Sequence, residues 1–303
     1  GNYLLACNND GGYYVYGGAN FDDGFSDGFS VNAVGFSHVV EGTQPGQIEG
    51  IDPDLFVYIM VWKRRIWFIE KDSSRAWYLP VDQITGKVTL FDFGTQFRRG
   101  GFLAQLGNWT IDGGAGIDDH LAAFSSEGDV VIFTGYDPDS AATDPAAFAL
   151  RGIWFVGALP EGRRQVSTYG GDLYVLSIFG ITQLSKLVAE AQVAANLIED
   201  SSARIDPYIT QLMKNSHARE GWYLLFLPRD QLLVVGVPEQ LINEGNGQLV
   251  MKTRRLAWSK MLDIPVATMM QHDSLTFGGG KVATPTSGGG KVFLMFDNSL
   301  DNV

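Results

Sequence analysis

A short two-strand unit recurs along this chain at nearly constant spacing. Each copy is an apolar strand, a turn of Gly, Asp or Ser, and a second strand. When one apolar residue marks each copy, the successive intervals are 54, 53, 49 and 52 residues. A period of about 50 residues with several strands in each repeat is typical of β-propeller blades. The sequence therefore predicts an all-β, β-propeller-like fold, which fixes no chemistry by itself. The five markers are Trp67, Leu121, Tyr174, Tyr223 and Leu275.

The repeat is interrupted once by a helical pattern. Apolar residues recur with helical spacing from Leu184 to Ile198, and Pro207 suits the first turn of a second helix. We therefore expect a short helical insertion around residues 184–215. The predicted organisation is a first set of blades over 1–181, with a hairpin at 1–18 and a loop-rich acidic stretch at 19–50, a helical insertion over 182–220, and a second set of blades over 221–303.

Composition agrees with one large β domain. The 303 residues are enough to bury an ample core, and the 37 glycines suit a chain with many turns. The single Cys7 excludes an internal disulfide and a multi-cysteine metal site. No apolar run reaches the roughly 18 residues that a membrane-spanning helix needs. The chain opens on a strand-like run without an initiator Met, so we expect it to be a piece of a longer polypeptide.

Charge is distributed unevenly. The formal net charge is −12, and residues 1–60 hold eight acidic residues and no Lys or Arg. Tight non-specific DNA binding depends on neutralising phosphates, so this balance argues against it. An acidic wall could still surround DNA and let a duplex slide without sticking. Solubility alone is the simpler explanation of the same balance.

Four pairs of adjacent arginines lie at or near the starts of predicted strands. Neighbouring residues of a strand point to opposite faces, so one arginine of each pair could cover its own sheet while the other reaches a partner. The simpler alternative is a set of local ion pairs with the many Asp residues. We take all eight as candidates for a subunit interface: Arg64, Arg65, Arg98, Arg99, Arg163, Arg164, Arg254 and Arg255.

Motifs that suggest enzyme chemistry lack their structural context. The sequence Gly-x-Ser-x-Gly at residues 24–28 matches a nucleophile elbow, but it lies in an acidic loop and not between a strand and a helix. The run at residues 113–118 matches one unit of a calcium-binding repeat, and such repeats act in tandem copies. Asp112, Asp118 and Asp119 are a candidate calcium site, although a plain acidic turn is favoured. The four histidines are far apart, and we expect His120 to be a strand-edge residue. We predict no catalytic residue and no cofactor.

Several segments resemble one protein family. They include KRRIWFIEKDSSRAWYLP at 63–80, and DDHLAAFSSEGDVVIFTGYDP at 118–138. Shorter matches lie at 97–101, 109–114, 162–164 and 170–173, with an echo at 277–279. Together they cover roughly residues 55–280 and resemble the podovirus-type phage tail nozzle family, also called tail tubular protein B or packaged-DNA stabilisation protein.

The resemblance implies a structural virion protein. Members of that family are propeller-based, assemble as a hexamer below the portal and adaptor, and form the channel that retains and conducts genomic DNA during ejection. The implied partners are further copies of the chain, the tail adaptor, other tail proteins, and duplex DNA that passes without sequence-specific binding. Two alternatives from other classes stay open: a propeller-fold enzyme such as a glycosidase, which acids gathered in a central pocket would favour, and a propeller interaction module, which exposed aromatics on a disc face would favour.

Overall fold

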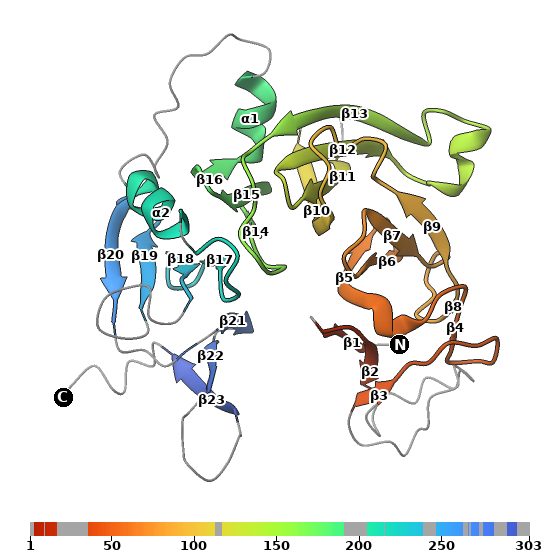
Figure 1. Cartoon of the computed structure of the whole chain (residues 1–303), viewed down its shortest axis with the longest axis horizontal. Coiled ribbons are helices and arrows are strands. Elements are labelled where there is room, and N and C mark those ends of the chain that lie inside the picture. The colour runs from red at the N-terminus through yellow and green to blue at the C-terminus, as the bar shows by residue number, and fades with distance from the viewer. Residues whose placement is uncertain are drawn as a thin grey trace. The chain divides into compact units, whose positions relative to one another are not determined.

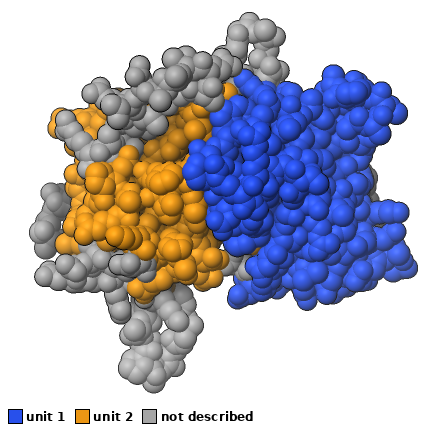
Figure 2. Space-filling view, turned by 45° about the horizontal axis from the view of Figure 1, so that its top comes forward, with its two compact units in different colours: residues 1–155 blue, residues 156–303 orange. Residues whose placement is uncertain are grey.

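The protein is described by a computed structural model. It describes residues 3–8, 10–16, 36–112, 117–190, 205–214, 216–238, 247–262, 266, 268–272, 275–281 and 290–295. The chain forms two compact units, residues 1–155 and 156–303 (Figure 2). Each unit is considered by itself below.

Unit 1 contains three antiparallel sheets, each built from strands that follow one another along the chain (Figure 1). The β1–β3 sheet consists of β1 (Leu4–Cys7), β2 (Tyr13–Tyr16) and β3 (Phe36–His38). The β5–β9 sheet consists of β5 (Phe56–Trp62), β6 (Arg65–Glu70), β7 (Arg75–Tyr78) and β9 (Thr89–Asp92). The β10–β13 sheet consists of β10 (Leu103–Asp112), β11 (Ile117–Ser125), β12 (Asp129–Gly135) and β13 (Phe148–Phe155). Two short strands outside these sheets, β4 (Ile48–Glu49) and β8 (Gly86–Lys87), pair in parallel.

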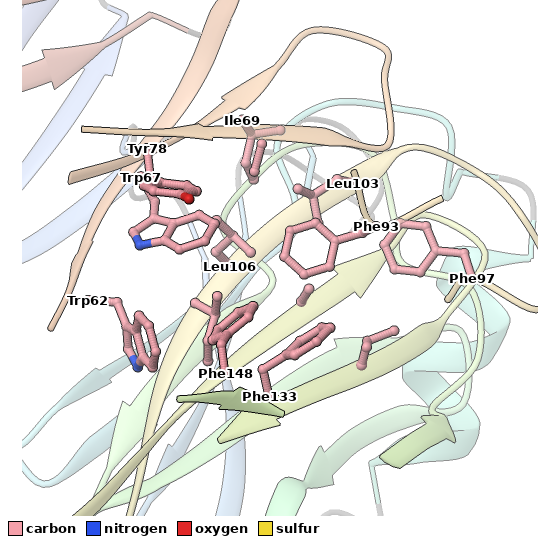
Figure 3. Close-up of a cluster of buried hydrophobic side chains, with 14 of the residues drawn as sticks. Trp62, Trp67, Ile69, Tyr78, Phe93, Phe97, Leu103, Leu106, Phe133 and Phe148 are labelled. Atoms are coloured by element: carbon pink, nitrogen blue, oxygen red, sulfur yellow. The ribbon is translucent and has the colours of Figure 1, made fainter. Parts of the chain in front are cut away.

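The β5–β9 sheet of unit 1 is buried on both faces. Side chains of a strand alternate between faces, and β6 is apolar on both. Trp67 and Ile69 join one buried cluster with the β10–β13 sheet, where Phe133 stacks on Phe148 at 4.5 Å (Figure 3). On the opposite face, Phe68 joins a second cluster with the β1–β3 sheet. The three sheets of unit 1 therefore pack face to face in a row.

Unit 2 contains three further antiparallel sheets and two helices. The β14–β16 sheet consists of β14 (Val166–Tyr169), β15 (Asp172–Ser177) and β16 (Gly180–Gln183). Helices α1 (Leu184–Glu190) and α2 (Asp206–Met213) come next in the described chain. The β17–β20 sheet consists of β17 (Tyr223–Leu227), β18 (Leu232–Gly236), β19 (Gln248–Lys252) and β20 (Ala257–Met261). The β21–β23 sheet consists of β21 (Thr268–His272), β22 (Leu275–Lys281) and β23 (Gly290–Met295).

Unit 2 repeats the packing rule of unit 1. In β18, Leu233 and Val235 face a cluster that includes α2 and the β14–β16 sheet. Leu232 and Val234 alternate with them and face a cluster shared with the β21–β23 sheet. The β17–β20 sheet is therefore apolar on both faces, and the three sheets again form a row.

The expectations from sequence are confirmed at the level of fold class. The described chain is mostly strand in several antiparallel sheets, so the fold is all-β. The predicted N-terminal hairpin is present as β1 and β2, and both predicted helices exist as α1 and α2. The predicted first helix continues to residue 198, but residues 191–204 lie outside the described residues, as do residues 19–35 of the acidic stretch and residues 17 and 18 of the hairpin. The three-part domain division stays a prediction.

One part of the predicted repeat is wrong. Tyr223 lies in β17, the first strand of its sheet, whereas the other four markers lie in the second strands β6, β11, β15 and β22. The fourth copy of the predicted repeat is therefore displaced by one strand relative to the other four copies. Both β17 and β18 are continuous apolar runs because their sheet is buried on two faces, and alternation cannot distinguish between such strands.

Candidate functional site

The first arginine pair lies in a tight turn between β5 and β6. Trp62 pairs with Arg65 across the hairpin, so Lys63 and Arg64 are its two central residues. Their φ angles are 48° and 61°, in the left-handed region that a type I′ turn requires. Asn-Gly is the preferred sequence there, because residues with a longer side chain are strained in this conformation. This turn instead carries two cations.

The two cations of this turn and Arg65, which follows them at the start of β6, contact different carboxylates. Lys63 Nζ lies 3.3 Å from Asp119 Oδ2 in β11. Arg64 Nε donates to Asp82 Oδ1 at 3.0 Å, and this pair is exposed. Arg65 is buried, and its Nη2 lies 2.7 Å from Asp137 Oδ1 and 2.9 Å from Asp139 Oδ2. The turn therefore connects the β5–β9 sheet to β11 of the β10–β13 sheet and to the loop between β12 and β13.

Arg65 is held by more than its ion pairs. Its Nη1 donates to the Leu79 carbonyl at 3.4 Å, and its guanidinium lies 5.6 Å from the centre of the Tyr78 ring. The pKa of Asp137 is lowered, first by the hydrogen bond from the Ser140 hydroxyl and further by the Asp139 amide and by Arg65, with partial burial opposing them. The carboxylate opposite Arg65 is therefore held in its charged form.

The second arginine pair precedes β10. Arg99 donates through its amide to Asp129 Oδ2 at 2.6 Å and through Nη1 to Oδ1 at 2.8 Å. Its guanidinium lies 3.7 Å from the centre of the Phe155 ring. Asp129 is fully buried, and it accepts a hydrogen bond from the Arg99 amide while the Arg99 guanidinium balances its charge. Arg98 is exposed.

The remaining two pairs belong to unit 2. Arg164 donates through Nη1 to the Thr268 hydroxyl, and its guanidinium lies 5.3 Å from the centre of the Tyr223 ring. Arg163 is half-buried. Arg254 and Arg255 are both exposed in the turn between β19 and β20.

The arginine pairs thus combine the two alternatives drawn from the sequence. In the first three pairs, the second arginine contacts its own fold. Local ion pairs with Asp account for Arg64, Arg65 and Arg99. Arg98, Arg254 and Arg255 are exposed and can reach a partner. Their role at a subunit interface stays a prediction.

The candidate calcium ligands are positioned at the far end of the β10–β11 hairpin. Asp112 ends β10, and Asp118 and Asp119 lie near the start of β11. Asp119 Oδ1 accepts a hydrogen bond from the Thr110 hydroxyl at 2.8 Å, and its Oδ2 faces Lys63. Within the described ranges, no group of three His, Cys, Asp or Glu residues is arranged to hold a metal ion. Residues 113–116 of the turn lie outside those ranges, as does the Gly-x-Ser-x-Gly sequence at 24–28.

The sequence predicts that His120 is a strand-edge residue, and this prediction is wrong. It is buried in β11, an inner strand of the β10–β13 sheet, opposite Trp109 in β10. Arg151 Nη1 lies 2.6 Å from His120 Nε2, and its guanidinium lies 5.6 Å from the centre of the Trp109 ring. Because arginine can only donate, His120 Nε2 is the acceptor of this contact.

A β-bulge in β13 explains how Arg151 reaches this position. The register with β12 shifts between Ile132 and Phe133, whose partners are Gly152 and Leu150. Arg151 is the extra residue, and such bulges redirect a side chain. The sequence signal was the glycine at 152 within an apolar strand, which often marks a bulge.

Two further observations bear on the class of protein. No helix within the described ranges has the length and apolar character needed to cross a membrane. No known family model matches the chain, and no curated protein matches it.

Proposed function

We propose that the chain is a β-propeller-like structural subunit. The support is the sheet packing, in which consecutive strands form small antiparallel sheets and the middle sheet of each row is apolar on both faces. Propeller blades are built from such sheets, and each blade covers the face of the next. This two-sided burial of the β5–β9 and β17–β20 sheets is the observation that carries the proposal.

The proposed role is that of a tail nozzle or tail tube component of a phage virion. There the chain would form part of the channel that retains genomic DNA and conducts it during ejection. The resemblance of residues 55–280 to the tail nozzle family supports this role. The net charge of −12 supports it as well, because a DNA conduit must not bind its cargo tightly.

The proposal includes self-association, with a hexamer as the expected assembly, and contacts with the tail adaptor and other tail proteins. Rigid sheets suit a channel wall. Arg65, Arg99 and Arg164 contact residues of their own chain and so stabilise the fold. The exposed arginines Arg98, Arg254 and Arg255 are available for contacts between subunits.

Electron microscopy of the purified chain, combined with native mass measurement, tests this function. We expect closed rings with a central channel and a mass that corresponds to six copies. A protein that stays monomeric at every concentration, or that forms compact particles without a channel, would contradict the proposal. Hydrolysis of a glycoside substrate by intact particles would favour the enzyme alternative instead.

A further inference from the structure

One end of the β17–β20 sheet carries a cluster of exposed cations. The four strands are in register, so the turns at 228–231 and 253–256 leave the sheet at the same end. The Thr253 amide donates to the Gln231 carbonyl at 2.9 Å, which joins the two turns. Residues 228–231 and 252–256 hold four cations and one carboxylate, so 4 − 1 gives a net charge of +3. We call this the basic end, and all four of its cations are exposed: Arg229, Lys252, Arg254 and Arg255.

The single carboxylate of these turns does not pair with the four cations. Asp230 Oδ2 accepts a hydrogen bond from the Thr276 hydroxyl at 2.7 Å and lies 3.4 Å from Gln271 Nε2. Both partners belong to the β21–β23 sheet, and Thr276 is fully buried. Lys252 Nζ contacts Asp230 through its main-chain carbonyl, at 3.2 Å, and not through its carboxylate. The carboxylate therefore fixes the turn to the neighbouring sheet and leaves the cations without a counter-ion from it.

The cations of unit 1 are used differently. Most of them form ion pairs with carboxylates of their own unit: Lys63, Arg64, Arg65, Arg75, Lys87 and Arg99. At the basic end of unit 2, no carboxylate within the described ranges forms an ion pair with any of the four cations. Unneutralised cations that gather at one place on a chain of net charge −12 favour an anionic partner.

The opposite charge gathers where three segments of unit 1 meet. The Gly12 amide donates to the Phe56 carbonyl at 3.0 Å, and the Lys71 amide donates to the Leu55 carbonyl at 2.8 Å. These bonds bring together the β1–β2 turn, the short helix Pro53–Leu55 and the β6–β7 turn. We call the exposed carboxylates of this place the acidic end: Asp10, Asp52, Asp54 and Asp72.

Most of the charge of the acidic end is not balanced within unit 1. Lys71 is its one Lys or Arg, so 1 − 4 gives a net charge of −3. Lys71 Nζ contacts the main-chain carbonyl of Asp10 at 3.1 Å, and His38 Nε2 lies 2.6 Å from Asp54 Oδ1. The carboxylates of Asp10 and Asp72 form no ion pair within the described part of the chain. Two basic ends or two acidic ends repel one another, whereas a basic end and an acidic end attract.

We propose that the basic end of one copy binds the acidic end of a second copy. This contact rests on the self-association proposed above and names the two surfaces that carry it. It is heterologous, so it leaves one free end of each kind, continues from copy to copy, and closes into a ring where the rotation allows. Duplex DNA is the less favoured occupant of the basic end, because its phosphates lie along its whole length and meet repulsion from the rest of an acidic chain.

Charge variants of the two ends test the contact. Arg254→Glu with Arg255→Glu reverses the basic end. Asp10→Lys with Asp72→Asn neutralises the acidic end, and asparagine tolerates the φ of 50° at residue 72. Circular dichroism and thermal melting of each variant check the fold, and sedimentation velocity measures association.

A further variant controls for net charge. Lys214→Glu with Lys260→Glu changes the charge of the chain by the same −4 as the basic-end variant, at two exposed positions that belong to neither end. A basic-end variant that is weaker than this control therefore reports the place of the charge and not its amount.

We expect each end variant to weaken self-association by about tenfold or more, while the net-charge control associates as the wild type does. An equimolar mixture of the two end variants should form one-to-one heterodimers, because each keeps the end that the other has lost. Wild-type association should weaken when salt rises to about 0.5 M, since salt screens exposed charges.

The other outcomes overturn the proposal. Association that either end variant leaves unchanged, or that the control weakens equally, would show that these ends do not decide it. A wild type that is monomeric at all concentrations would mean that the ends meet within one chain or bind another protein. A labelled duplex that binds the wild type and not the basic-end variant would assign the basic end to nucleic acid. Wild-type chains that associate through these ends without closing into rings would contradict the proposed function alone, and rings that tolerate both end variants would contradict this inference alone.

Discussion

Arg64 and Arg65 are chain neighbours with opposite surroundings. The Arg64 side chain is 74% exposed beside a half-exposed Asp82, whereas that of Arg65 is 8% exposed among Asp137, Asp139 and the Tyr78 ring. Exposed ion pairs contribute little to stability because water and salt screen them. Removing a buried side chain that makes charged hydrogen bonds costs more, because water does not replace those bonds.

We therefore predict a large difference between two matched substitutions. Arg65→Gln should lower the free energy of unfolding by about 1.5–3 kcal/mol, since the buried guanidinium loses its charged hydrogen bonds to Asp137 and Asp139, which stay partly exposed to water. Arg64→Gln should change it little. Equilibrium denaturation in urea measures both, with an unchanged dependence on urea as the sign that the unfolding transition is comparable. Equal losses for the two variants would mean that the burial of Arg65 does not decide its contribution.

The surroundings of these arginines could not be predicted from the sequence. Arg65 and Asp137 are 72 positions apart, and the contact exists only because β5–β9 and β10–β13 pack together. An alternating pattern predicts which face of a strand a residue occupies, but not which residue of another sheet lies opposite. The sequence therefore showed where the cations are and left open whether they were ion-paired or free.

At the scale of the element, the Lys63-Arg64 turn is the least expected piece of local structure. Both residues are left-handed, and such positions in non-glycine residues cluster where a function requires them. An Asn-Gly turn would satisfy the backbone better. The cations persist there because Lys63 and Arg64 each reach a carboxylate outside the hairpin.

This conformation makes a prediction about the turn itself. Arg64→Gly should keep or raise the melting temperature, because relief of the left-handed strain offsets the loss of an exposed ion pair. Arg64→Val should lower it by several degrees, because a β-branched residue is poorly tolerated at positive φ. Arg98→Gly is the control. Arg98 has no positive φ, so this variant relieves no backbone strain and only raises the chain entropy of the unfolded state. A lower melting temperature for Arg64→Gly than for Arg98→Gly would contradict this reading of the turn.

The strands themselves were largely predictable, and the errors have one cause. The N-terminal hairpin, both helices and the strands around Trp67, Leu121, Tyr174 and Leu275 agree with the sequence pattern. The misaligned marker Tyr223 and the misplaced His120 both lie in strands whose residues are buried on both faces of the sheet. In such strands apolar residues occur on both faces, so alternation no longer indicates the register or the exposed edge.

At the scale of the whole molecule, the acidic balance leads to the last prediction. An acidic channel wall and the phosphates of DNA repel one another only within a Debye length, which is about 8 Å at physiological salt. The repulsion therefore acts only at the narrowest part of a channel. We expect the purified assembly to show no measurable affinity for random duplex DNA at physiological salt, and the exposed arginines to face neighbouring subunits. Fluorescence anisotropy with a labelled duplex, between 50 and 200 mM salt, measures this. Affinity that falls steeply with salt, and that an Arg254→Ser, Arg255→Ser double variant abolishes, would show that the arginines grip phosphates. The better explanation would then be that cationic side chains hold the DNA, and not that the DNA passes along an acidic wall.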